Sequence, residues 1–128
     1  MRLLLDTHAV LWSLADADVF REPVAAALDD PRNEKLVSIA SFWEMAIKVG
    51  IGKLAMEEPP ETVLERYVRE RIATILPIRA VHLRLLRTLP HHHRDPFDRM
   101  LVAQALADDL TLVSHDAEID AYGVRRLW

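Results

Sequence analysis

The chain opens on a short apolar run that ends in an acid. Leu3, Leu4 and Leu5 precede Asp6, and a largely apolar, helix-like stretch follows over residues 9–14. A continuous apolar run of this length is typical of a buried strand in a parallel sheet. The pattern therefore predicts a strand that leads into a helix. Asp6 then lies at the carboxyl end of the strand, where open α/β sheets bind ligands.

The rest of the chain alternates between further short strands and helices. Strands are expected over 35–39, 73–77, 111–114 and 124–128. Helices are expected over 24–28, 41–49, 61–71, 80–89 and 96–107, with a short helical turn around Glu118. In the helix over 61–71, one buried stripe is expected to contain Val63, Leu64, Tyr67 and Val68. This alternation predicts an α/β domain with a parallel sheet covered by helices on both faces.

Length and composition fit one domain over residues 1–128. The 128 residues are 51% hydrophobic and 28% charged, which suffices for an ordinary core. No apolar run approaches the ~18 residues that span a bilayer, and the N-terminus lacks the pattern of a signal peptide. We therefore expect a cytoplasmic protein that does not enter a membrane. The absence of cysteine excludes disulfides and thiolate metal sites, which leaves carboxylates and imidazoles as metal ligands.

Charge is distributed unevenly along the chain. The formal net charge of −4 argues weakly against nonspecific binding to nucleic acid. Between Arg66 and Arg99, however, lie eight arginines and only three acids. This segment is compatible with a basic face for phosphates and equally with a set of solvated helix faces.

Four acids stand at the boundaries of expected elements, where ligands usually bind. They are Asp6, Glu44, Asp98 and Asp116. In a parallel sheet, Asp6 and Asp116 both lie at the carboxyl edge. Because clustered carboxylates do not all remain ionised without compensation, magnesium or manganese is the natural neutralising ion.

Each acid also has a structural interpretation. Ser41 and Glu44 have the spacing of a capping box. Asp95 precedes Pro96 as a helix N-cap would, and Asp98 in the first turn is favoured by the helix dipole. Asp116 is a candidate cap for the helical turn that follows it. Taken singly, each acid favours the structural interpretation, and only their combination favours chemistry.

Three stretches together resemble the PIN-domain family, and within it the VapC-type ribonuclease toxins of bacterial toxin–antitoxin pairs. They are LLLDTHAVLW, SIASFWEMAIKVGIGKL and HHHRDPFDRMLVAQALADDLTLVSHD. The resemblance implies a three-layer α/β/α domain with a central parallel sheet of four to five strands. It also implies an RNA substrate, a cognate antitoxin protein and a homodimer.

The resemblance further implies which residues bind one or two divalent ions, Mg²⁺ with Mn²⁺ as the alternative. The four acids of the family fall, in order, on Asp6, Glu44, Asp98 and Asp116, with Asp95 as a second candidate for the third. Two hydroxyl positions beside the metal fall on Thr7 and Ser114. The chemistry is consistent, because metal ions supply both an activated water and charge stabilisation for phosphodiester hydrolysis.

The histidines and aromatic residues have less specific interpretations. Because adjacent loop residues rarely converge on one ion, we expect His91, His92 and His93 to form a polar loop near the RNA entrance. His8 and His115 flank proposed ligands, where an imidazole either contacts phosphate or serves a structural hydrogen bond. Aromatic residues expected as core or dimer contacts are Trp12, Phe42 and Trp43.

Two other functions fit the sequence less well. Phosphatases that use an aspartate nucleophile carry a second aspartate two positions after the first, and here that position is His8. A degenerate PIN module that binds RNA or a protein partner without cleavage would lack one or more acids, and all four are present.

Overall fold

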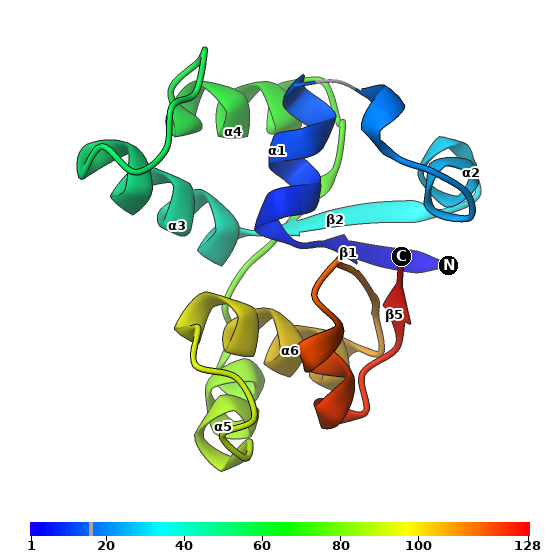
Figure 1. Cartoon of the computed structure of the whole chain (residues 1–128), viewed down its shortest axis with the longest axis vertical. Coiled ribbons are helices and arrows are strands. Elements are labelled where there is room, and N and C mark those ends of the chain that lie inside the picture. Colours follow the sequence, from blue (N-terminus) through cyan, green and yellow to red (C-terminus); the bar gives the residue numbers. More distant parts are fainter. Residues whose placement is uncertain (16) are drawn as a thin grey trace.

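A five-stranded parallel sheet forms the centre of the structure (Figure 1). The computed structural model describes residues 1–15 and 17–128. The strand order is β3-β2-β1-β4-β5, and every neighbouring pair is parallel. The strands are β1 (Arg2–Leu5), β2 (Glu34–Ser38), β3 (Thr74–Leu76), β4 (Thr111–Val113) and β5 (Arg126–Leu127). The predicted parallel sheet is confirmed, and its last strand is shorter than expected.

Helices cover both faces of the sheet. They are α1 (Thr7–Ala15), α2 (Val24–Asp29), α3 (Ile39–Gly50), α4 (Pro60–Arg69), α5 (Ala80–Thr88) and α6 (Pro96–Asp108), with the 3₁₀ helices η1 (Ala17–Val19) and η2 (Ala117–Tyr122). Helices α1 to α4 lie on one side, and α5, α6 and η2 lie on the other (Figure 1). The expected three-layer α/β/α architecture is therefore confirmed.

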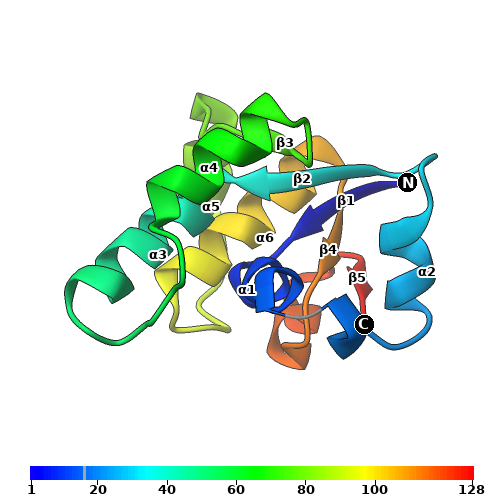
Figure 2. The ribbon, with the colours of Figure 1, turned by 90° about the horizontal axis from the view of Figure 1, so that it is seen from above.

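The alternation of side chains along the central strand divides the core in two. Leu3 and Leu5 are buried against α1 to α4, whereas Leu4 is buried against α5 and α6. Because successive side chains of a strand point to opposite faces, a strand covered on both faces is apolar at every position. The three-leucine run is thus the signature of the central strand (Figure 2).

The junction of β2 and α3 differs from the prediction. The strand ends at Ser38, and Ile39 is already helical. The Ser38 hydroxyl caps α3 by accepting a hydrogen bond from the backbone N–H of Ala40 at 3.0 Å. Glu44 therefore lies beyond the first turn, and the capping-box interpretation of Ser41 and Glu44 is wrong. Its physical reason is that β2 passes into α3 without a loop, so the helix begins earlier than the sequence signals suggest.

Two apolar side chains are more exposed than predicted. Val68 is 59% exposed because the buried side of α4 contains Val63 and Tyr67, and Val68 lies outside it. Trp43 is 60% exposed, although its neighbour Phe42 is in the core as expected. Of the two alternatives for Trp43, the core position is therefore excluded, and the dimer contact stays a prediction.

The strand register brings the predicted site residues to one edge. Leu5 of β1 pairs with Val37 of β2 and with Val113 of β4, so the three strands end almost level. Asp6, which follows β1, donates its backbone N–H to the Val113 carbonyl at 3.0 Å. In the described part of the chain, no helix has both the length and the apolar character needed to cross a membrane.

The cap of α3 leads to a stability prediction. Replacing Ser38 by alanine should lower the free energy of unfolding by about 1 kcal/mol, because the first turn of α3 loses a side-chain acceptor. Chemical denaturation measures the change. Thr62→Ala removes an exposed hydroxyl within α4 and should change stability much less. Equal losses in the two variants would contradict the capping role of Ser38.

Candidate active site

The candidate site lies at the carboxyl edge of the sheet, where β1 and β4 end and where α3 and α6 begin. Asp6 is almost fully buried there and sits between the last residue of β1 and the first of α1. Its Oδ1 accepts the backbone N–H of Ala9 at 2.7 Å, and the Ser114 side chain also hydrogen-bonds to its carboxylate. Burial, together with the charge of Glu44, raises the pKa of Asp6 despite these hydrogen bonds. The carboxylate is thus held by donors but remains costly to ionise.

Glu44 is buried on α3 and has two polar partners. The Thr7 hydroxyl lies 2.6 Å from Glu44 Oε1 and 3.0 Å from Ser41 Oγ. Lys48, one turn further along α3, lies 2.5 Å from Oε2. The hydrogen bond to Glu44, aided by the negative charges of Asp95 and Asp98, raises the pKa of Lys48. Lys48 is therefore a positive charge that the chain itself supplies at the edge of the acidic site. The sequence alone did not reveal this role.

Asp95 and Asp98 occupy the first turn of α6 but have different surroundings. Asp95 is the N-cap, and its Oδ1 accepts the backbone N–H of Phe97 at 2.8 Å and that of Asp98 at 3.5 Å. Burial and the like charges of Asp95, Asp6 and Glu44 raise the pKa of Asp98 to about 7, although His93 opposes the shift. Asp98 is thus the acid whose charge is least compensated.

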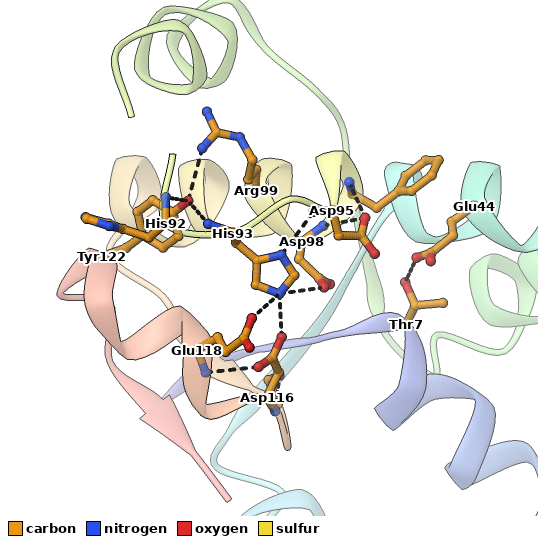
Figure 3. A network of polar contacts seen from close by, with 12 residues as sticks. Thr7, Glu44, His92, His93, Asp95, Asp98, Arg99, Asp116, Glu118 and Tyr122 are labelled. Carbon is orange, nitrogen blue, oxygen red and sulfur yellow. Dashed lines mark hydrogen bonds and ion pairs between the residues drawn. The ribbon is translucent and has the colours of Figure 1, made fainter. Parts of the chain in front are cut away.

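Asp116 meets Asp98 across the site through His93 (Figure 3). The imidazole Nε2 lies 2.6 Å from Asp116 Oδ2, 3.5 Å from Asp98 Oδ2 and 3.7 Å from Glu118 Oε2. The other Asp116 oxygen caps η2 by accepting the backbone N–H of Glu118 at 2.9 Å. Although burial opposes it, the hydrogen bonds from His93 and Glu118 lower the pKa of Asp116.

The structure therefore brings some predicted residues into direct proximity and others only into electrostatic range. One ligand atom each from His93, Asp98 and Asp116 lies within 4.8 Å of the others. Asp6 and Glu44 influence the charge of Asp98 but are held by their own partners. Thr7 lies beside Glu44 and Ser114 beside Asp6, so both predicted hydroxyls contact acids of the site.

His93 is the residue that the sequence analysis underestimated. It was grouped with His91 and His92 because the three are adjacent, yet only His93 is turned towards the acids (Figure 3). The ring of His92 instead packs against Tyr122, with ring centroids 5.1 Å apart. No signal in the sequence distinguishes His93 from its neighbours, because its shortest contact is with Asp116, the N-cap of η2, which lies 23 residues further along the chain.

The other predicted polar residues lie around the site or serve the fold. His8 and His115 pack against Trp12. Among the arginines of the basic segment, Arg99 is buried, Arg66 pairs with Glu58 and Arg79 pairs with Asp108. Arg79 is also exposed, as are the remaining five, Arg69, Arg71, Arg84, Arg87 and Arg94. The segment thus contains both structural and solvent-facing arginines, and a role in phosphate binding stays a prediction.

The donor set fits a hard divalent cation. The acids offer carboxylate oxygens, which Mg²⁺ and Mn²⁺ prefer. The raised pKa values of Asp6 and Asp98 mean that ionising either acid costs free energy in the metal-free protein. A bound cation removes that cost by favouring the charged forms.

One comparison with known proteins identifies a family. The sequence model of the PIN domain matches residues 3–124, whereas a comparison with curated proteins found no match. A chain of VapBC2 from Rickettsia felis, bound to a DNA fragment from their promoter, has a TM-score of 0.73 at 16% identity, covering 100% of this chain and 99% of that chain.

Two further solved structures have the same fold. A chain of DNA-bound VapBC from Salmonella typhimurium has a TM-score of 0.73 at 15% identity, covering 99% of this chain and 97% of that one. A chain of FitAcB from Neisseria gonorrhoeae has a TM-score of 0.61 at 17% identity, covering 98% and 96%. At such low identities the likeness concerns the fold.

The raised pKa of Asp98 leads to a prediction for the metal-free protein. Its folded-state pKa of about 7 exceeds the ordinary value of 3.8, so the folded state holds this proton more tightly than the unfolded state does. The stabilisation that this proton contributes is fully present below the unfolded-state pKa of Asp98. It is lost as pH rises through the folded-state pKa. The loss amounts to at most about 4 kcal/mol.

Denaturation in the presence of a chelator, repeated between pH 3.8 and about pH 7, measures the effect. Asp98→Asn is the control, because asparagine carries no charge at any pH and should lack this fall in stability. Parallel stability curves for the two proteins would show that Asp98 ionises as an ordinary aspartate does.

Proposed function

This chain belongs to the PIN domain family, and from that premise we propose that it is a magnesium-dependent endoribonuclease, the toxin of a toxin–antitoxin pair. The observation that carries the proposal is the convergence of acids from β1, α3, α6 and the β4–η2 junction on one edge of the sheet. Burial and the like charges around Asp98 raise its pKa to about 7, which marks the position where a cation is needed.

In this proposal four carboxylates hold the ion, namely Asp6, Glu44, Asp98 and Asp116. Mg²⁺ is the expected ion, and Mn²⁺ has the same preference for oxygen ligands. When bound, such an ion supplies a water that is nucleophilic near neutral pH and stabilises charge on the departing oxygen. Serine, cysteine or histidine nucleophiles are then not required.

The residues around the acids prepare the site. Thr7 holds Glu44 and Ser114 holds Asp6, so that two carboxylates keep their orientation before substrate arrives. Lys48 neutralises Glu44 in the metal-free protein. Asp95 stabilises the first turn of α6, from which Asp98 projects. Asp95 thus supports the third acid in place of acting as a principal ligand.

RNA is the proposed substrate. The loop over 90–94 carries the exposed side chains of His91, His92 and Arg94 directly beside the acids, and exposed arginines on α4 and α5 continue the basic segment. Arginine side chains such as these bind the phosphate backbone. The proposal places the loop at the RNA entrance.

The partners follow from the similar structures. Two of these are VapBC assemblies bound to DNA, which supports a protein partner. We propose that this partner is a cognate antitoxin, and that the chain forms a homodimer and acts in the cytoplasm. Co-expression with the protein encoded by an adjacent gene, followed by purification and mass measurement, tests the assembly.

The central experiment measures RNA cleavage by Asp6→Asn. Asparagine keeps the size of the side chain but removes one charge from the site, so cleavage of total RNA in Mg²⁺ should be abolished while the fold is kept. Chelation of the metal should stop RNA cleavage by the wild-type protein. Mapping the new RNA ends identifies the target.

Cleavage by Asp6→Asn at the wild-type rate, in protein free of host nucleases, would exclude Asp6 from the site. Wild-type protein that binds RNA without cutting it would support a degenerate PIN module.

A second pair of variants separates the two acids of α6. Asp98→Asn should lose both metal affinity and cleavage, because the amide does not supply the charge. Asp95→Ser should stay folded with reduced activity, because serine retains most of the roughly 1 kcal/mol that an N-cap contributes. Metal titration and cleavage rates decide between them. An inactive Asp95→Ser beside an active Asp98→Asn would reverse the assignment, and equal losses would mean that the pair shares the site.

A further inference from the structure

We infer that His93 is a positioning residue, which orients Asp116 through its Nε2–H and is kept from binding the ion itself, so that the site presents only oxygen ligands. The inference rests on the proposed metal site and adds a residue and a cation preference to it. The spacing of His93, Asp98 and Asp116 at first suggests the opposite, a mixed nitrogen and oxygen site.

The backbone around His93 determines which ring nitrogen carries the proton. The backbone N–H of Asp95 points to His93 Nδ1 at 3.0 Å. Because a backbone N–H can only donate, Nδ1 supplies the lone pair and the proton of the neutral ring is on Nε2. The Nε2–H therefore donates to Asp116 Oδ2 at 2.6 Å.

This tautomer excludes His93 as a ligand in the observed geometry. A histidine that binds a metal through Nε2 needs a lone pair there and usually donates its Nδ1–H to a neighbouring acceptor. Here the neighbour of Nδ1 is a donor, so the pattern is reversed. Metal binding by His93 would require loss of the Asp95 hydrogen bond.

Asp116 is the side chain that benefits. Its Oδ2 accepts from His93 and its Oδ1 accepts from the Glu118 backbone N–H. A carboxylate oxygen accepts two bonds, so each oxygen keeps capacity for a cation while the two donors fix its orientation. Such outer hydrogen bonds orient ligands before the ion arrives.

The loop that carries His93 is itself held in place. Tyr122 Oη accepts the backbone N–H groups of His92 at 3.0 Å and His93 at 2.9 Å. The buried Arg99 donates to the same oxygen at 3.0 Å and to the Pro90 carbonyl at 2.8 Å (Figure 3). Because Tyr122 and Asp116 both belong to the η2 segment, the loop and the acid are fixed to one another.

A cation preference follows from this arrangement. Imidazole nitrogen favours Zn²⁺ and other transition metals, whereas carboxylate oxygen suits Mg²⁺ and Mn²⁺. With His93 held as a donor, the ion meets only oxygen. His93 thus keeps a nitrogen that lies beside the site from shifting its preference towards Zn²⁺.

Two measurements test the inference, and the first needs no metal. Long-range ¹H–¹⁵N NMR of the metal-free full chain, under mildly alkaline conditions, should show His93 with its proton on Nε2. A proton on Nδ1 would overturn the inference.

The second measurement compares the binding of Mg²⁺ and Zn²⁺ to variants by calorimetry. His93→Ala removes the donor and should weaken Mg²⁺ binding about 10- to 100-fold. His93→Gln keeps an N–H donor and should stay within about threefold of wild type. His91→Ala, an exposed change in the same loop, is the matched control.

The outcomes separate His93 from the nuclease proposal. Unchanged Mg²⁺ binding in His93→Ala would overturn the inference, as would a loss of Zn²⁺ binding in His93→Gln much larger than its loss of Mg²⁺ binding. Wild-type protein that binds Mg²⁺ in the expected His93-dependent way but cleaves no RNA would support the inference and contradict the nuclease function. Wild-type protein that cleaves RNA without Mg²⁺ binding would contradict both the proposed metal and the role of His93.

Discussion

The burial of neighbouring carboxylates, together with their mutual repulsion, is the constraint on which the candidate site depends. Like charges close together in a poorly solvated place do not all ionise without compensation, and Asp98, with a pKa of about 7, shows that compensation is incomplete. Several other side chains at this edge of the sheet act against that repulsion. Hydroxyl groups hold Asp6 and Glu44, Lys48 supplies a positive charge, and His93 donates to Asp116.

The fold also supplies hydrogen-bond donors from its own backbone. Asp6 accepts from an N–H in the first turn of α1, Asp95 from the first turn of α6, and Asp116 from the start of η2. Structural capping and metal binding had looked like alternatives for each acid, but a carboxylate has enough lone pairs for both. One oxygen of Asp116 caps a helix while the other faces Asp98 through His93. Capping thus orients Asp116 for the proposed chemistry.

This arrangement lowers the stability of the metal-free protein but keeps the acids in position for the ion. The metal-free protein holds Asp6 and Asp98 where ionisation is unfavourable, and a cation relieves that cost. Rigid surroundings are then needed, because flexible acids would simply move apart. Arg99 and Tyr122 provide rigidity on one side by fixing the 90–94 loop, and the two apolar cores fix the strands and helices on the other.

The sequence by itself determined the order of the elements, the parallel sheet and the positions of four acids at element boundaries. Those features depend on local apolar runs and caps, and the Asp95–Pro96 start of α6 is an example. It misplaced the start of α3 because the β2–α3 junction has no loop to mark it. It left Trp43 as either a core or a dimer contact, because spacing alone does not say which face a neighbouring element covers. Only the tertiary structure decided the role of His93, the pairing of Lys48 with a site acid, and which carboxylates lie close together. The physical reason is that these interactions depend on where folding brings side chains in three dimensions, and for His93 and Asp116 the partners lie 23 residues apart in the chain.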